Sequence, residues 1–371
     1  MKKILAVILA ALTLAFGAFI FAACDDASDK TPNEGGTQGG TQGGTQGGTQ
    51  GGTQGGTQGG TQEVEVEVYL PDGTPALALA KVITEGVEIE GYSANFHIIA
   101  AADIGKVFAS TDADLAIMPT IGAATNYKNG MGIQLVSTNV FGNLFIVGVN
   151  GTADSFADLK GKTVMTTAAT TIQLFQYLLK ANDIKNVVGA PDGTPDADTV
   201  YLVSYDGGNQ IIQNLKLAET NKTEAYGVLG EPQVTMCQTN VPSASIAIDF
   251  QAEWKTLTSY EGYPQASLIA RNTFVSEHVD FVEAFATALE DNGTWLAQES
   301  NIEAFQNALK EYNETADYQT TLAGAKLTVD TVNRCNLDFQ MASEVKASVI
   351  DYIGRLNSAI TLQDNFFFTA A

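Results

Sequence analysis

The sequence predicts an α/β fold with two lobes, each a mixed sheet flanked by helices, and a helical C-terminal third. Short strands that are apolar on both faces alternate with helical patterns, as in sheets that helices cover. The pattern restarts near Gly161, so two similar units follow one another. The body after residue 62 contains 309 of the 371 residues, which suits two lobes better than one core.

The N-terminal segment 1–23 has the pattern of an export signal. Lys2 and Lys3 precede a mainly apolar run that ends just before Cys24. A transmembrane helix is the alternative, because the run is long enough to span a bilayer. The basic start and the small residues before Cys24 favour a signal peptide, and the end resembles a lipobox although Phe21 stands where Leu is usual. We therefore expect residues 1–23 to be removed and Cys24 to carry lipid.

Residues 24–62 are expected to be a lipid-anchored, disordered linker. Seven copies of Gly-Gly-Thr-Gln fill 35–62, and such a chain has no apolar side chains from which to build a core. The folded body would then stand off the membrane and still reach a partner embedded in it.

The first elements of the body alternate between strand and helix patterns. Residues 64–70 alternate polar and apolar, and Pro71 stops that strand. The expected strands are 64–70, 95–100, 114–118 and 144–149, and the expected helices are 76–84 and 103–109. Thr74 and Pro75 suit the start of the first helix.

The second unit repeats this order and leads into a helical C-terminal third. The expected strands are 161–165, 199–204, 225–229 and 267–270, and the expected helices are 172–181 and 209–218. Apolar residues at helical spacing predict three further helices, around 279–289, 295–309 and 345–356.

The charge balance excludes several classes of partner. The formal net charge is −23, and removal of Lys2 and Lys3 with the leader makes it −25. Such a surface repels nucleic acid, and no basic cluster reverses that repulsion. Only His97 and His278 are present, so we expect no structural zinc site and no cofactor. Whether Cys237 and Cys335 form a disulfide stays open, because no spacing motif decides it.

Enzyme motifs are absent from the sequence. It contains no Gly-x-Ser-x-Gly elbow, no P-loop and no Gly-x-Gly-x-x-Gly loop. We therefore expect a binding protein rather than an enzyme.

Four short polar turns follow predicted strands. They are 71–75, 119–123, 166–171 and 230–233. In open α/β sheets ligands lie beyond the carboxyl ends of strands, near helix N-termini. The turns therefore predict a ligand site.

Several stretches of the body resemble type 2 periplasmic binding proteins. They are Asp114–Pro119 with Ala123 and Ala124, Asp158–Val164, Glu231–Thr235 and the tail Asp364–Phe368. The similar subgroup takes up nitrate, sulfonates, taurine and thiamine precursors. The resemblance implies a Venus-flytrap: a first lobe from 63–140 and 268–371, a second lobe from 141–267, and a ligand trapped between them.

The resemblance also implies a task. The chain would be the extracytoplasmic, lipid-anchored and monomeric binding component of an ABC importer, delivering a small polar organic or anionic solute to membrane permease subunits. The alternative is a lipoprotein that senses a ligand and signals to a membrane receptor. A permease and an ATPase encoded next to it would favour transport, whereas an adjacent sensor kinase would favour sensing.

Each candidate ligand residue has a structural alternative. The candidates are Asp72, Gly73, Thr74, Thr120, Asn143, Thr166, Thr167, Ala168, Thr170, Thr171 and Glu231. The threonines of 166–171 can hold a ligand or simply cap a helix. Asp72 can pair with an amine or bond its own turn, Thr120 can simply end a strand, and Asn143 can serve the ligand or the hinge. Glu231 can face a cationic group or end a strand.

The lipid anchor can be tested by replacing Cys24 with Ser. Without the thiol no lipid can be attached, so the variant should be released from the membrane or stay unprocessed. Membrane fractionation and the size of the mature chain measure both outcomes. A variant that is processed and retained like the parent would rule out lipidation at Cys24.

Overall fold

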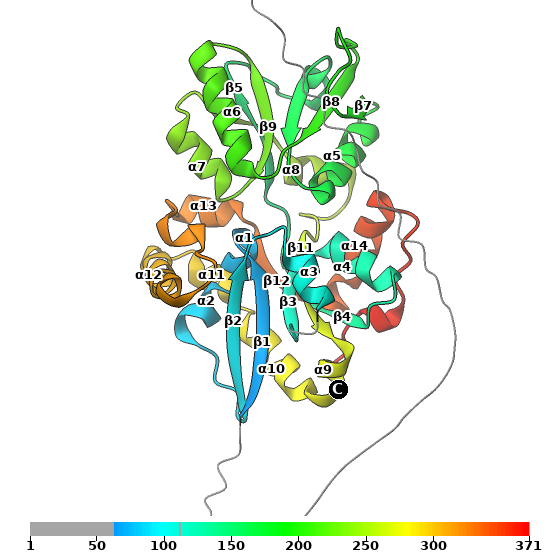
Figure 1. Ribbon diagram of the computed structural model, residues 1–371. Coiled ribbons are helices and arrows are strands. Elements are labelled where there is room, and N and C mark those ends of the chain that lie inside the picture. The colour runs from blue at the N-terminus through cyan, green and yellow to red at the C-terminus, as the bar shows by residue number, and fades with distance from the viewer. Residues whose placement is uncertain (1–62, 111–112, 371) are drawn as a thin grey trace, which may run out of the picture. The chain divides into compact units, whose positions relative to one another are not determined.

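The computed structural model describes residues 63–110 and 113–370, which belong to one compact unit, Gly60–Ala371. The signal segment, Cys24 and the repeat linker lie outside the described residues. Two mixed six-stranded sheets flanked by helices form this unit, which confirms the predicted α/β class (Figure 1). We call the elements around the first sheet lobe 1 and those around the second sheet lobe 2.

The first sheet has the order β12-β4-β11-β3-β1-β2. Its strands are β1 (Val64–Pro71), β2 (Tyr92–Ile99), β3 (Leu115–Pro119), β4 (Ile133–Val140), β11 (Ala266–Arg271) and β12 (Leu337–Met341). β1 pairs in parallel with β2 and β3, whereas β11 and β12 pair antiparallel with their neighbours.

The second sheet has the order β10-β5-β9-β6-β8-β7. Its strands are β5 (Leu144–Val149), β6 (Thr163–Thr166), β7 (Lys185–Val188), β8 (Thr199–Ser204), β9 (Ala225–Gly230) and β10 (Ser245–Asp249). Residues of β5 alternate between two packed faces, because Ile146 joins the larger core cluster while Phe145 and Val147 join the smaller one. Both faces of this sheet are thus covered by helices.

Helices connect and cover the strands. Those of lobe 1 are α1 (Thr74–Leu77), α2 (Ala80–Glu85), α3 (Ile104–Ala109), α4 (Thr120–Lys128), α9 (Asn272–Glu277), α10 (Val279–Ala288), α11 (Asn292–Leu296), α12 (Glu299–Thr315), α13 (Val329–Arg334) and α14 (Ala342–Leu356), with 3-10 turns η2 (Thr321–Gly324) and η3 (Asp364–Phe366). Those of lobe 2 are α5 (Ala169–Ala181), α6 (Gly208–Asn221), α7 (Gln233–Asn240) and α8 (Phe250–Leu257), with the 3-10 turn η1 (Phe156–Leu159).

Two predicted helices are each divided in the structure. The helix expected over 76–84 is α1 and α2, and the helix expected over 295–309 is α11 and α12. Residues 76–80 are all at most 2% exposed, so no polar face fixes a single helical register there. Packing around these buried residues therefore determines where α1 ends and α2 begins.

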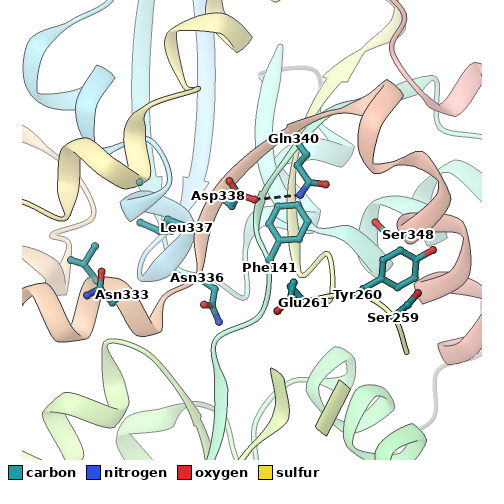
Figure 2. A pocket seen from close by; sticks show the side chains of 13 residues that line it. Phe141, Ser259, Tyr260, Glu261, Asn333, Asn336, Leu337, Asp338, Gln340 and Ser348 are labelled. Carbon is teal, nitrogen blue, oxygen red and sulfur yellow. Dashed lines mark hydrogen bonds between the residues drawn. The ribbon is translucent and has the colours of Figure 1, made fainter. Parts of the chain in front are cut away.

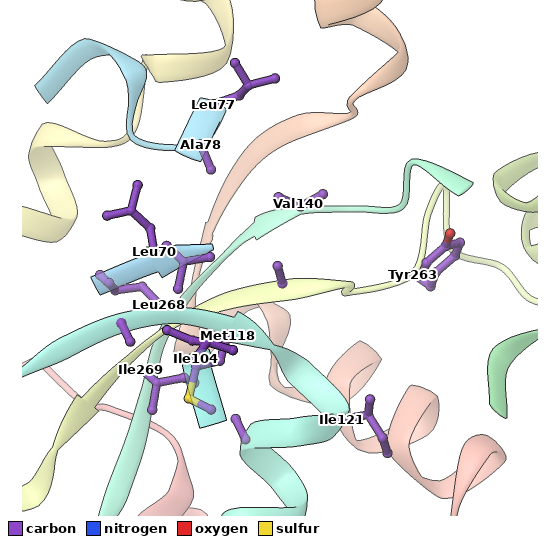
Figure 3. Packing of buried hydrophobic residues seen from close by; sticks show 14 of the residues in the cluster. Leu70, Leu77, Ala78, Ile104, Met118, Ile121, Val140, Tyr263, Leu268 and Ile269 are labelled. Atoms are coloured by element: carbon purple, nitrogen blue, oxygen red, sulfur yellow. The ribbon is translucent and has the colours of Figure 1, made fainter. Parts of the chain in front are cut away.

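The core of lobe 1 lies between its sheet and the covering helices. Figure 3 shows Leu70 of β1, Met118 of β3 and Ile269 of β11 packed together with Ile104 of α3. All four side chains are at most 5% exposed. This packing holds the carboxyl ends of β1 and β3 in fixed positions.

The chain crosses between the two sheets twice. The first crossing, residues 141–143, joins β4 to β5, and the second, residues 258–265, joins α8 to β11. They touch at Gly142, which has φ of 96°, a value that favours glycine. A Cβ added there would lie 2.7 Å from Cε1 of Tyr263 and 2.9 Å from Cγ of Gln251. The backbone of the first crossing therefore packs directly on the second.

Replacing Gly142 with Ala should destabilise the protein by about 2–4 kcal/mol, because the left-handed conformation and the contact with Tyr263 both oppose a side chain. Urea unfolding measures this. Gly354 is the matched control: it lies in α14, and an added Cβ would meet nothing within 4 Å. Gly354→Ala should stabilise by up to about 1 kcal/mol. Equal stability of the two variants would contradict the close packing of the crossings.

Candidate functional site

The four polar turns lie where strands end and helices begin. β1 and β3 end at Pro71 and Pro119, and β6 and β9 end at Thr166 and Gly230. The helices that follow are α1, α4, α5 and α7. A turn separates strand from helix at three of these positions, as the sequence predicted. The turn expected over 119–123 is wrong, because β3 ends at Pro119 and α4 begins directly at Thr120.

Three of the predicted residues meet in one buried network, which we call the junction: Thr74, Asn143 and Glu231. Thr74 Oγ1 donates to the carbonyl oxygen of Glu231 at 2.6 Å, and Asn143 Nδ2 donates to Thr74 Oγ1 at 2.5 Å and to the same carbonyl at 3.2 Å. Each residue is at most 3% exposed. The junction thus joins α1 of lobe 1, the first crossing and the end of β9 in lobe 2.

Gln265, which the sequence did not mark, holds Asn143 from the second crossing. Its Nε2 donates to Asn143 Oδ1 at 2.7 Å, and the backbone N–H of Asn143 donates to Gln265 Oε1 at 2.9 Å. The amide of Asn143 is therefore bonded on both sides within the protein. In this structure Asn143 ties the two crossings to each other and to Thr74.

The carboxylate of Glu231 is fully buried and is held by residues of both lobes. Its side chain is 0% exposed, and Nε of Arg334, at the end of α13, pairs with Oε1 at 2.6 Å. The backbone N–H and the hydroxyl of Thr235 donate to the carboxylate, each at 3.1 Å. The cation opposite Glu231 is thus the chain's own Arg334, which the sequence did not identify.

Cys335 lies beside the junction. Its thiol is 0% exposed and 3.9 Å from Thr74 Oγ1, and burial raises the pKa of this thiol above its usual range. Cys237 in α7 is also buried and unpaired, and burial raises its pKa to about 11. Both thiols are free in the structure, and both are poor nucleophiles at neutral pH.

Asp72 is bonded to the segment that leads into η2. Its carboxylate accepts from the Tyr318 hydroxyl at 3.1 Å, from Thr320 Oγ1 at 2.5 Å, and from the N–H and hydroxyl of Thr321 at 3.0 and 2.8 Å. Burial, and then the charge of Asp72, raise the pKa of Tyr318 to about 12. Gly73, with φ of 108°, lets the chain turn from Asp72 into α1. The carboxylate of Asp72 thus fastens a loop in this structure.

Thr120 lies inside lobe 1. It is 0% exposed, and its hydroxyl is 2.9 Å from Ser267 Oγ, which is itself 2.9 Å from Thr138 Oγ1. This chain of hydroxyls satisfies polar side chains of α4, β11 and β4. In this structure Thr120 is a buried, hydrogen-bonded residue at the start of α4.

The turn 166–171 is shorter than expected, because α5 already begins at Ala169. Thr166 is buried as the last residue of β6, and Thr171 is 9% exposed. Thr167 and Thr170 are half-buried, and Ala168 is exposed. Ala168 is the N-cap of α5 and offers no side-chain cap, so no threonine takes that role. Among the predicted residues of this turn, Thr167, Ala168 and Thr170 are therefore at least partly exposed to solvent.

A pocket of about 440 Å³ opens at the two crossings, and none of the predicted ligand residues lines it. Phe141 of the first crossing, Tyr260 and Glu261 of the second, and residues of α13 and β12 line it (Figure 2). Asn336 fixes one wall, since its Nδ2 donates to the Gly142 carbonyl at 2.7 Å and its own carbonyl accepts from the Phe141 N–H at 3.0 Å. No sequence motif marks this pocket.

The described residues contain no group of three or more His, Cys, Asp or Glu placed to hold a metal ion. None of the helices in residues 63–110 and 113–370 is long and apolar enough to cross a membrane.

Comparison with solved structures shows the fold. The chain is similar to an ABC transporter from Parabacteroides distasonis, with 19% identity, 82% of this chain and 99% of that chain covered, and a TM-score of 0.62. A zinc-bound ligand-binding component of an ABC-type import system from Staphylococcus aureus has 12% identity, covers 82% of this chain and 96% of its own, and has a TM-score of 0.58. The periplasmic aliphatic sulphonate binding protein SsuA from Escherichia coli has 12% identity, coverages of 81% and 95%, and a TM-score of 0.54.

No family model matches the chain, and no curated protein matches it either. The solved structures nevertheless confirm the two-lobed type 2 periplasmic-binding-protein fold expected from the sequence. At these identities the likeness concerns the fold and leaves the ligand undecided.

Replacing Arg334 with Leu should destabilise the protein by roughly 3 kcal/mol, because the buried Glu231 carboxylate loses its cation. Adding Glu231→Gln to that variant should recover part of the loss, since the unpaired charge is then gone. Urea unfolding of the two single variants and the double variant measures the coupling. Strictly additive losses would contradict the pairing of Glu231 with Arg334.

Proposed function

We propose that this chain is the lipid-anchored, extracytoplasmic solute-binding component of an ABC importer. It traps a small polar organic or anionic solute between lobes 1 and 2 and delivers it to a membrane permease. The observation that carries the proposal is the pair of six-stranded sheets joined by two adjacent crossings, which allows one lobe to move against the other.

The proposed solute site lies at the N-terminus of α5. α5 has 13 residues, and free N–H groups at such a terminus attract anions and polar oxygens. Thr167 and Thr170 add hydroxyls that donate as well as accept, so a neutral polar ring is also accommodated. Asp72, Thr120 and Glu231 each bond to other residues of the chain in this structure. We therefore assign the polar contacts with the solute to residues 167–170 at the start of α5, which we call the α5 turn.

The membrane arrangement is proposed from the sequence. Lipid on Cys24 anchors the chain, and the repeat linker lets the body reach a permease in the same membrane. In this arrangement the chain acts as a monomer and performs no chemistry on its solute.

The test begins with a thermal-shift screen of sulfonates, pyrimidines and small carboxylates, because a solute at about 100 times its Kd adds about 2.7 kcal/mol of stability. With a solute in hand, a Thr167→Val and Thr170→Val double variant should lose about 5- to 150-fold in affinity, or about 1–3 kcal/mol. Val preserves the shape of Thr while removing its hydroxyl, so the fold should be kept. Calorimetry measures the affinity.

Thr220→Val is the matched control, because Thr220 is exposed on α6 and its hydroxyl bonds only the preceding turn at Lys216. This control should bind like the parent. If the double variant also binds like the parent, the hydroxyls of the α5 turn do not contact the solute. If no small solute stabilises the protein, the proposed transport role fails.

A further inference from the structure

We propose that the pocket at the two crossings is a second binding site, specific for a small amine-bearing cation. We call it the crossing pocket and define it by Phe141, Tyr260, Glu261, Asn333, Asn336 and Asp338. It is distinct from the α5 turn, since neither Thr167 nor Thr170 lines it. The inference therefore goes beyond the proposed function and does not depend on it.

The size and the walls of the pocket suit a small organic molecule. Its volume of about 440 Å³ lies within the range of ligand pockets in proteins, about 300–1,000 Å³. The aromatic rings of Phe141 and Tyr260 supply flat apolar walls, and Asn333 and Asn336 supply amide groups. Figure 2 shows Asp338 joined to Gln340 by a hydrogen bond, and both residues line the pocket together with Phe141.

The charged side chains that line the pocket favour a positively charged ligand. Glu261 and Asp338 both line the pocket, and none of its lining residues is Lys, Arg or His. Glu261 is paired with Lys255 at 2.5 Å, but Asp338 has a neutral donor, Gln340 Nε2, at 3.3 Å. A carboxylate can accept about four hydrogen bonds, so Asp338 retains capacity for an ammonium group.

The aromatic rings of the lining also favour a cationic ligand. A cation within about 6 Å of the centre of an aromatic ring is attracted to the ring face. Phe141 and Tyr260 come from different crossings and both line the pocket, so an ammonium group held by Asp338 would lie near aromatic surface. An anion would meet the carboxylate of Asp338, which has no cationic partner among the lining residues, so we expect the pocket to disfavour sulfonates and carboxylates.

The experiment is calorimetric titration of the detergent-solubilised full-length protein with putrescine, a small diamine, and with ethanesulfonate as the oppositely charged probe. Putrescine should bind and ethanesulfonate should not compete with it. Asp338→Asn should weaken putrescine binding about tenfold, which corresponds to about 1.4 kcal/mol. Asn333→Lys should weaken it by a similar factor, because it places a cation in the lining.

Two controls distinguish putrescine binding in the crossing pocket from a general effect of charge and from binding at the α5 turn. Asp192→Asn removes the same charge from an exposed residue outside the pocket lining and should leave putrescine affinity unchanged. Thr167→Val with Thr170→Val should also leave putrescine affinity unchanged.

Absence of putrescine binding up to about 10 mM, where even a millimolar site would be mostly filled, overturns the inference. Parent-like affinity in both Asp338→Asn and Asn333→Lys overturns it as well. If putrescine fails while a screened solute binds and is lost in the threonine double variant, the crossing pocket is rejected and the proposed function stands.

Discussion

The burial of the Glu231 carboxylate is the constraint on which the relation between the two lobes depends. A charge without exposure to water must be paired and hydrogen-bonded, and here Arg334 of lobe 1 and Thr235 of lobe 2 satisfy it. The carbonyl of the same residue holds Thr74 and Asn143. A single residue at the end of β9 thus bonds to α1, the first crossing and α13.

This constraint limits the lobe closure that we propose. Separation at the junction would remove the cation from Glu231 and the hydroxyl from its carbonyl at the same time. The closure that we propose is therefore a rotation about the crossings that keeps these bonds. The tight contact of Gly142 with Tyr263 and Gln251 packs the first crossing against the second crossing and α8.

The sequence predicted the fold class because most strands carry their own apolar signal. β3, β5 and β9 are buried runs of apolar residues, and each was expected within two residues of its observed bounds. β4 was not expected, because its buried residues Ser137, Thr138 and Asn139 are polar. These residues can be buried because they form hydrogen bonds to one another and to β11. The sequence pattern of β4 alone does not identify these partners.

The junction was predicted only in part, for the same reason. The sequence located the strand ends near which its residues lie, and Thr74, Asn143 and Glu231 were among the candidates for ligand contacts. Their partners come from far along the chain: Gln265 is 122 residues from Asn143, and Arg334 is 103 residues from Glu231. Whether a polar residue faces a ligand or another part of the protein depends on such partners, and periodicity and turn chemistry carry no information about them.

The central claim is that the two lobes close on a solute by rotation about the crossings. Small-angle scattering of the Cys24→Ser protein, with and without a saturating amount of the solute found by screening, tests it most directly. The account predicts a smaller radius of gyration in the bound protein. An identical radius of gyration and scattering profile in both states would contradict it and would leave a rigid binding protein.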